Sequence, residues 1–543
     1  MSKRASVSNT KTILRRLFGR GTVAAAAAVA LAVSPVLSAQ AADYVPISGA
    51  GSSWSSNAMD QWRRNVEQYG MRINYASTGS SDGRNQFANG TVDFALSEIP
   101  YGLTDGGVTE PLPARPFAYM PIVAGGTSFM YNLSAGGTQI ANLRLSGEVI
   151  AKIFTGVITQ WDDPAIKADN PSIDLPSRQI VPVVRSDGSG STAQFTTWMS
   201  KQYGSIWDTY CAAAGRPTPC GVTSNYPVIA GKGFIAQPNS QGVAGYVSQA
   251  ANIGTITYVE YSYALKTGFP VAKVLNGADY YVEPTASNVA VGLLGAQINT
   301  TPGDFYLTQI LDGVYNNSDP RAYPLSSYSY MIIPTSTSGS TFTDDKGKTL
   351  GAFANYFLCE GQQQAEVLGY SPLPINLVQA GLDQVTKIPG VGSSTVNIAD
   401  CNNPTFSSDG SNTLANNAPM PAECDKKGVD QCLDATGGAA GSGGGSGSAG
   451  GAAGSKGKGT GSGSGSGGGN GGRFGIPLGA GPMICDPDTG VCSNVVASAT
   501  KVDGLPAWGV TQTIMLLALV FLLALIFVPP LLGRRLRRAT KEQ

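Results

Sequence analysis

The chain has 543 residues, with 36 basic and 36 acidic side chains and no histidine, which excludes a Ser-His-Asp or Cys-His nucleophile and any histidine-ligated metal. Six basic residues lie in the first 41 positions and five in the last ten, so the region between them holds 25 basic and 35 acidic residues. Such an acidic surface repels the backbone of nucleic acids, so we expect no nucleic-acid partner.

Residues 1–41 have the pattern of an export signal. Basic residues precede the apolar run TVAAAAAVALAVSPVL, and Ala39-Gln40-Ala41 fits an A-x-A cleavage site. The paired arginines in RRLF at positions 15–18 also occur in twin-arginine signals, so the general and twin-arginine export routes both stay open. No cysteine follows the apolar run, which disfavours a lipoprotein anchor. We therefore expect the folded part of the chain to lie outside the cytoplasm.

Short β-branched strands alternate with amphipathic helices between residue 44 and about residue 401. In chain order the pattern predicts a strand ending in GAGSSW (49–54), a helix over 55–70, a strand over 71–78, a short helix after GSSDG (79–83), a strand over 90–98, a strand over 178–184 and a helix over 191–204. In the first helix Met59, Trp62, Val66 and Tyr69 share one apolar face, and Gly70 fits a C-terminal cap. This alternation is typical of an α/β layered fold with a mostly parallel sheet. Ligands in such sheets bind beyond the carboxyl ends of the strands.

Three predicted strand-to-helix corners combine glycine with serine: Gly51-Ser52-Ser53, Gly79-Ser80-Ser81 and Gly188-Ser189-Gly190-Ser191. Free backbone N–H groups at a helix start attract anions, but serine or glycine there can also be a plain cap. Arg185 and Asp187 precede the third corner, where they could equally form a surface ion pair of little energetic weight. Together the corners and the arginine favour a compact tetrahedral anion held by neutral donors. A Walker A lysine pattern is absent, which argues against nucleoside triphosphates.

All eight cysteines lie in the region expected to be exported, and their even number suggests disulfides. We expect neighbours to pair: Cys211 with Cys220, Cys359 with Cys401, Cys424 with Cys432, and Cys485 with Cys492. Other pairings stay open, because spacing alone does not fix connectivity. Metal thiolate sites are a further alternative, but the cysteines lack CxxC spacing.

The C-terminal part of the chain changes composition. The Gly/Ser-rich run at 437–472 cannot bury enough apolar surface to fold, so we expect 405–506 to be a disordered stalk with cysteine loops. Residues 507–533 form an uncharged apolar run long enough to span a bilayer, although a buried core helix is an alternative. The basic tail 534–543 then lies in the cytoplasm by the positive-inside rule, and the rest of the chain lies outside.

Five motifs occur in order: GAGSSW, INYASTGSSDGRNQFANGTVDFALSE, ITQWDDPAI, VPVVRSDGSGST and ITYVEYSYA. With them the chain resembles, from about Ile47 to Ile388, the PstS-type phosphate-binding components of ABC phosphate importers, within the type 2 periplasmic binding proteins. The resemblance implies a binding domain over 42–404, built as two α/β lobes with mixed, mostly parallel sheets. Crossing strands join the lobes, which close on phosphate like a clamp. It places lobe one at 44–122 and 323–401, and lobe two at 123–322.

The resemblance also implies the residues that bind the anion: Ser53, Trp54 (through its backbone amide), Ser80, Glu98, Arg185, Ser189, Gly190 and Ser191, with Asp187 supporting Arg185. Glu98 stands where the family has an aspartate that accepts the proton of bound phosphate. A carboxylate there repels fully ionised sulfate, which favours phosphate. Because glutamate reaches one methylene further than aspartate, arsenate or a phosphate ester stays open as the ligand.

We therefore predict a monomeric protein that captures inorganic phosphate and delivers it to ABC permease subunits, tethered to the lipid bilayer by its C-terminal helix. The expectation includes no cofactor, no metal and no catalytic residue. The alternative is a cell-surface oxyanion-binding or sensing protein that is not coupled to transport. A third class, an extracellular phosphoesterase, is disfavoured because the sequence has neither histidine nor a convincing metal-binding cluster.

Overall fold

The computed structural model describes residues 44–338, 341–392, 396–407, 410–441, 483–485 and 492–494. Residues 1–447 form one compact unit and 448–543 a second. In the second unit the structure describes a hairpin of β18 (Met483–Cys485) and β19 (Cys492–Asn494).

Several predicted segments lie outside the described residues. They are the signal 1–41, most of the Gly/Ser-rich stalk, the apolar run 507–533 and the tail 534–543. None of the described helices has both the length and the apolar character that crossing a bilayer requires. The export signal and the membrane anchor therefore stay predictions.

One large sheet contains two sets of parallel strands. Predicted corners follow the first two strands of the first set and the first strand of the second set. The first set is β1 (Ile47–Gly51), β2 (Ile73–Ala76) and β3 (Phe94–Ser97). The second set is β10 (Val181–Arg185), β11 (Ile235–Gln237) and β12 (Thr255–Glu260). Their β-branched and small residues suit strands that are covered on both faces, and β12 is buried along its whole length.

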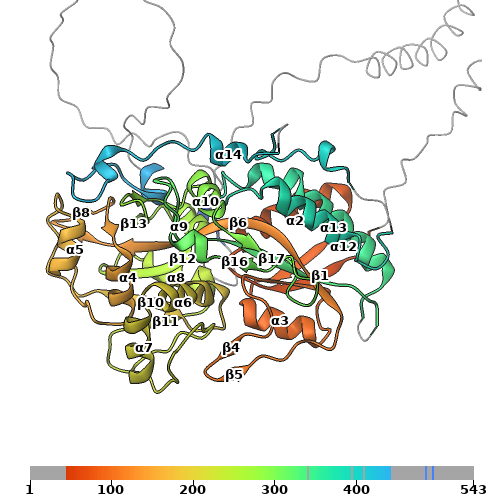
Figure 1. Cartoon of the computed structure of the whole chain (residues 1–543), viewed down its shortest axis with the longest axis horizontal. Helices are drawn as coiled ribbons and strands as arrows, with labels where there is room; N and C mark the ends of the chain where they lie inside the picture. Colours follow the sequence, from red (N-terminus) through yellow and green to blue (C-terminus); the bar gives the residue numbers. More distant parts are fainter. Residues whose placement is uncertain are drawn as a thin grey trace, which may run out of the picture. The chain divides into compact units, whose positions relative to one another are not determined.

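Two long strands cross between the sets, as Figure 1 shows. β6 (Phe117–Asn132) pairs antiparallel with β12 and with β17 (Ser326–Pro334), and β17 pairs antiparallel with β3. The prediction of mixed, mostly parallel sheets is thus confirmed: the strands are parallel within each set, and the crossing strands pair antiparallel. β6 runs antiparallel to its neighbours in both lobes. The predicted lobe boundary at 122/123 lies within β6, and the boundary at 322/323 lies just before β17.

Each set of strands has its own hydrophobic core, so the fold is two-lobed. Lobe one packs its strands against α2 (Ser56–Val66), α3 (Ser80–Ala88), α12 (Asp344–Leu358) and α13 (Ile375–Val385). Lobe two uses α4 (Gly147–Phe154), α6 (Gly190–Gln202) and α7 (Gly204–Ala213) on one face of its strands, and α8 (Asn239–Val247) and α9 (Tyr261–Thr267) on the other. α10 (Ala286–Leu293) lies beside the crossing strands β6 and β17.

The remaining described strands and α-helices of this unit are short. They are the strands β4 (Thr104–Asp105), β5 (Val108–Thr109), β7 (Ser134–Ala135), β8 (Thr138–Gln139), β9 (Arg144–Leu145), β13 (Val271–Leu275), β14 (Tyr281–Val282), β15 (Gln297–Ile298) and β16 (Gln309–Ile310), and the helices α5 (Pro164–Asp169), α11 (Asp312–Tyr315) and α14 (Thr413–Asn416). Of these, β13 joins the large sheet beside β6, and β4 and β5 form a hairpin on lobe one.

The first predicted helix, α2, buries the face that its sequence predicts, except near its C-terminal end. Met59, Trp62 and Val66 are buried on one face of α2, as their spacing predicts. Tyr69 was expected on the same face but is 48% exposed. The helix tightens to a 3-10 turn after Val66, which rotates Tyr69 away from the core, and Gly70 ends the turn in the left-handed conformation at φ 83°.

The described residues 402–407 and 410–441, called the C-terminal segment below, pack on the folded unit, so the expectation of a disordered stalk from residue 405 is not met for them. Next to lobe one, Asn403 Nδ2 and Thr405 Oγ1 donate to the carbonyl of Leu373 at 3.1 and 2.8 Å. α14 then packs on α10. Next to lobe two, Thr436 Oγ1 donates to the carbonyl of Ala141 at 3.0 Å. The segment therefore contacts both lobes.

Three of the predicted disulfides are confirmed: Cys211–Cys220, Cys359–Cys401 and Cys424–Cys432. The second attaches the start of the C-terminal segment to the end of α12, and the third closes a loop within the segment. For the fourth, the register of β18 and β19 places Cys485 opposite Cys492. That disulfide stays a prediction.

The C-terminal segment carries a partly buried ion pair whose loss should destabilise the unit. Lys273 Nζ lies 2.8 Å from Asp425 Oδ2, and their side chains are 15% and 9% exposed. In Asp425→Ala the ammonium of Lys273 loses its partner, so we expect the free energy of unfolding to fall by about 3 kcal/mol in urea denaturation. The control Asp345→Ala removes an exposed pair with Lys348 and should change stability by less than about 1 kcal/mol. Equal stability of both variants would contradict the packing of this segment.

Candidate anion-binding site

The three predicted corners meet where the two lobes touch. The second and third corners bond directly: Gly190 N donates to Ser80 Oγ at 3.1 Å, and Ser81 N donates to the carbonyl of Gly188 at 3.1 Å. The first corner reaches lobe two through Ser53, whose Oγ accepts from the backbone N of Ser240 at 2.9 Å. Residues predicted from separate motifs thus share one inter-lobe contact.

Glu98 lies at the centre of this contact, at the end of β3, and is only 1% exposed. Its Oε1 accepts from the hydroxyls of Ser52 and of Ser329, the latter at 2.8 Å. Its Oε2 accepts from Ser80 Oγ at 2.8 Å. A Cβ on Gly190 would lie 2.1 Å from Oε2, so only glycine lets lobe two approach the carboxylate this closely.

Arg185 ends β10 and presents its guanidinium to the same region. Its Nε donates to Asp187 Oδ1 at 2.7 Å, its Nη2 donates to Asp187 Oδ2, and its Nη1 lies 3.4 Å from Ser240 Oγ. Asp187 also accepts from Asn239 N at 2.8 Å, so the carboxylate is held from two elements. The Arg185 side chain is 2% exposed and that of Asp187 17%, which excludes the alternative of a loose surface pair.

One of the predicted serines acts as a helix cap, an alternative that the sequence left open. Ser189 Oγ accepts from Thr192 N at 3.2 Å at the start of α6. Ser52 Oγ accepts from Trp54 N at 3.0 Å, so the amide that the resemblance assigns to the anion is bonded within the chain. The buried hydroxyl of Ser191 has no hydrogen-bond partner among the described residues. An anion at this site would exchange some of these internal bonds for bonds to its own oxygens.

The charges near the site favour an anion that carries a proton. The Asp187 carboxylate pairs with the guanidinium of Arg185, whereas the Glu98 carboxylate accepts from serine hydroxyls, so neutral hydroxyls and amides must supply much of the attraction for an anion. Burial raises the pKa of Tyr258 to about 12, and this hydroxyl, which is 3.3 Å from Arg185 N, adds no negative charge. Burial also raises the pKa of Glu260, at the end of β12, which favours its neutral form.

Sequence reasoning missed three residues of this network: Ser52, Ser240 and Ser329. Ser52 lies inside the GAGSSW motif, so its place beside the anion corner was visible, but its bond to Glu98 was not. Ser240 is the second residue of α8, which follows β11 after one residue, and the composition of this strand-to-helix corner could have indicated it. Ser329 lies on the crossing strand β17, and nothing local distinguishes it from its neighbours.

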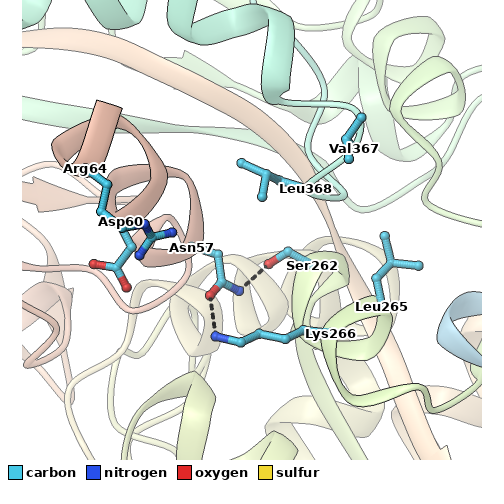
Figure 2. Close-up of a pocket in the computed structure, with 8 residues that line it drawn as sticks. All are labelled: Asn57, Asp60, Arg64, Ser262, Leu265, Lys266, Val367 and Leu368. Carbon is cyan, nitrogen blue, oxygen red and sulfur yellow. Dashed lines mark hydrogen bonds between the residues drawn. The ribbon is translucent and has the colours of Figure 1, made fainter. Parts of the chain in front are cut away.

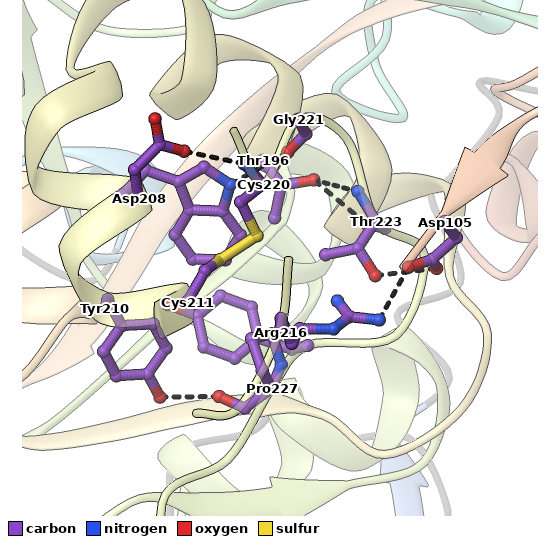
Figure 3. Close-up of a disulfide and its surroundings, with 12 residues drawn as sticks. Asp105, Thr196, Asp208, Tyr210, Cys211, Arg216, Cys220, Gly221, Thr223 and Pro227 are labelled. Carbon is purple, nitrogen blue, oxygen red and sulfur yellow. Dashed lines mark hydrogen bonds and ion pairs between the residues drawn. A yellow bond between two sulfur atoms is a disulfide. The ribbon is translucent and has the colours of Figure 1, made fainter. Parts of the chain in front are cut away.

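A second group of contacts joins the lobes around Asp105, at the end of β4 (Figure 3). Its carboxylate accepts from Arg216 Nη2 at 2.6 Å and from Thr223 Oγ1 at 2.7 Å. Both partners lie on the loop after α7, which the Cys211–Cys220 disulfide constrains. Asp105 therefore stabilises the closed arrangement without contacting Arg185 or Glu98.

Removing this contact should weaken anion binding indirectly. In Asp105→Ala the closed state loses an ion pair and the hydrogen bonds from Thr223 and Ser224, while the open state loses none of these, so affinity for the expected phosphate ligand should fall about fivefold. Calorimetric titration with phosphate measures the change. The control Asp60→Ala removes an ion pair within α2 and should leave the affinity unchanged. Wild-type affinity in Asp105→Ala would show that the contact does not hold the lobes together.

A cavity of about 330 Å³ lies elsewhere between the lobes, beside α2, α9 and the loop at Val367 (Figure 2). Asn57 Nδ2 donates to Ser262 Oγ at 2.8 Å across it. Its lining includes the charged residues Asp60, Arg64 and Lys266, and none of the predicted anion-binding residues. The mixed charges give this cavity no clear preference for anions.

Known proteins are similar in sequence to this folded unit. The family profile described as a PBP superfamily domain matches residues 34–360. The phosphate-binding protein PstS of Xylella fastidiosa (strain Temecula1) is 32% identical over 346 residues, which cover 63% of this chain and 85% of that protein. The PstS of Pasteurella multocida (strain Pm70) is 31% identical over 334 residues, 61% of this chain and 88% of that protein.

A solved structure is also similar to this chain. It is a high-affinity periplasmic phosphate-binding protein, PfluDING, with phosphate bound; it is 19% identical, with a TM-score of 0.47, and the match covers 64% of this chain and 100% of that one. The conclusion about family rests on the profile and on the sequence relatives, which span most of their own length. The chain belongs to the PstS-type phosphate-binding proteins of the PBP superfamily.

Proposed function

We propose that the two lobes capture inorganic phosphate outside the cytoplasm and that the protein delivers it to the permease subunits of an ABC importer. One observation carries the proposal: a buried, aspartate-held guanidinium from lobe two and a buried carboxylate from lobe one lie at one inter-lobe contact rich in serine hydroxyls. The similarity to proteins named for phosphate binding supports the choice of anion.

The two charged side chains would have different tasks. Arg185 would donate charge-assisted hydrogen bonds to phosphate oxygens, which are about twice as strong as neutral ones. Glu98 would accept the proton that phosphate retains at neutral pH. Sulfate has no such proton, so two negative oxygens would face each other and binding would be disfavoured. Arsenate matches phosphate in both shape and protonation, and we expect it to bind as well.

Capture requires that lobe closure stabilise the bound anion more than water does. The closed arrangement replaces mobile water by dipoles that the fold already holds in place, such as the hydroxyls of Ser80 and Ser191 and the amide of Gly190. These groups come from both lobes, so opening separates them and releases the ligand. In this account the protein performs no covalent chemistry, and docking on the permease opens it.

The C-terminal part of the chain would keep the binding unit near the permease. The apolar run 507–533 with its basic tail fits a single membrane-spanning helix, and the Gly/Ser-rich stretch before it fits a flexible stalk. Such a tether raises the effective concentration of the binding unit at the membrane. The packing of the C-terminal segment on the folded unit shortens the stalk to the residues after 441.

Phosphate uptake tests delivery and separates it from the alternative of sensing without transport. Cells that lack the gene should take up less radiolabelled phosphate at low external concentration, and the wild-type gene should restore uptake. A gene carrying Arg185→Ala should not restore it. If uptake is normal without the gene while the purified protein still binds phosphate, the transport role is wrong and the sensing alternative takes its place.

A further inference from the structure

The two oxygens of the Glu98 carboxylate have different surroundings. An ionised carboxylate accepts hydrogen bonds and donates none, so each hydroxyl beside it must point its proton at the carboxylate. Oε1 accepts from Ser52 and Ser329, which belong to the end of β1 and to the crossing strand β17. Within the described residues, Oε2 accepts from one hydroxyl, that of Ser80.

The proton of each hydroxyl on Oε1 is committed to that oxygen. Ser52 Oγ accepts from Trp54 N at 3.0 Å and from Ser55 N at 3.3 Å, which leaves its own proton for Glu98. Ser329 Oγ lies 3.2 Å from Ser55 Oγ but only 2.8 Å from Glu98 Oε1, so the carboxylate is the better acceptor. Oε1 is therefore fixed from two separate elements of the fold.

Oε2 is the oxygen that faces lobe two. The position that a Cβ of Gly190 would take lies 2.1 Å from it, and Gly190 N donates to Ser80 Oγ, the one described donor to Oε2. A carboxylate oxygen accepts up to two hydrogen bonds in the carboxyl plane, so Oε2 keeps a site for one more donor. The lobe that approaches this oxygen, through Gly190, is the one that carries Arg185 and Ser191.

We propose that Ser52 and Ser329 are positioning residues that hold Oε1 so that Oε2 alone accepts the proton of the bound oxyanion. The inference rests on the proposed function and deepens it. The family aspartate has one rotatable bond fewer than Glu98, and the two hydroxyls remove the extra freedom of the longer side chain. The preference for protonated over unprotonated oxyanions is thus set by residues that need not touch the anion.

Calorimetric titration of the full chain with inorganic phosphate and with sulfate tests this inference. In Ser329→Ala the phosphate affinity should fall about tenfold while the sulfate affinity stays the same, so the ratio of the two falls about tenfold. Ser329→Thr keeps the hydroxyl and should keep the ratio. Ser52→Ala should also lower the ratio, although it additionally frees the amide of Trp54.

Ser327→Ala is a matched control on the same strand. Ser327 is buried like Ser329, but its hydroxyl has no partner among the described residues, so the ratio should not change. In a Glu98→Gln background, Ser329→Ala should no longer alter the ratio, because both changes act through one group. A ratio that falls equally in both backgrounds would place the action of Ser329 elsewhere.

The outcomes separate this inference from the proposed function. If the wild type does not bind phosphate, the proposed function fails. If the wild type binds phosphate and discriminates against sulfate, but Ser329→Ala and Ser52→Ala discriminate equally well, only the positioning role fails. An equal loss of affinity for both anions would indicate a purely structural role for the two serines and would overturn the inference.

Discussion

Replacing Arg185 with alanine is expected to lower phosphate affinity by at least about 100-fold, which corresponds to about 3 kcal/mol. The variant removes a buried guanidinium whose hydrogen bonds to an anion are charge-assisted and each contribute about 1.5–3 kcal/mol. It also leaves the carboxylate of Asp187 without its forked partner beside the anion. Both effects lower the affinity for phosphate, and calorimetric titration measures the combined loss of affinity.

Arg321→Ala provides a control of matched geometry. Arg321 forms the same kind of forked pair with an aspartate two residues away, with Nε 2.9 Å from Asp319 Oδ1 and Nη2 2.8 Å from Asp319 Oδ2. It lies near the C-terminal segment and contacts none of the predicted anion-binding residues. We expect phosphate affinity to stay at the wild-type value in this control. Tight phosphate binding by Arg185→Ala would show that the anion lies elsewhere.

Replacing Glu98 with glutamine is expected to reduce the preference for phosphate over sulfate by about 100-fold, or about 3 kcal/mol. The change removes the negative charge that repels sulfate, and it replaces an oxygen acceptor by an amide that can donate. Phosphate affinity should therefore fall while sulfate affinity rises. Titrations with each anion at the same pH and ionic strength give the ratio.

The variant Glu98→Asp separates the effect of the carboxylate charge from the effect of side-chain length. Aspartate retains the carboxylate but withdraws it by one methylene from Ser52 and Ser329. Because the charge persists, we expect Glu98→Asp to discriminate against sulfate far better than Glu98→Gln. If the glutamine variant discriminates as well as the wild type, Glu98 does not accept the proton of the ligand.

The parts of the site that the sequence predicts are those encoded over a few neighbouring residues. A strand that ends in glycine and serine before an amphipathic helix indicates a strand-to-helix corner, and GAGSSW and RSDGSGST both fold in this way. The apolar spacing of α2 identified three of its four predicted core residues. Tyr69 was missed because the change from α-helix to 3-10 helix depends on how the turn closes at Gly70.

The parts that the sequence did not predict depend on contacts between distant residues. Ser329 is 231 positions from Glu98, and only the course of β17 between the lobes brings them together. The C-terminal segment looked like a stalk because its last residues are rich in glycine. Its packing relies on side chains far upstream, such as Lys273 with Asp425, which composition cannot reveal.

The central claim is that this chain binds a protonated tetrahedral oxyanion between its lobes. Calorimetric titration of the full wild-type chain with phosphate and with sulfate, under identical conditions, tests it most directly. The account predicts saturable binding of one phosphate per chain, with sulfate at least about 100-fold weaker, or about 3 kcal/mol. Equal affinity for the two anions, tighter binding of sulfate, or no binding of phosphate would contradict it.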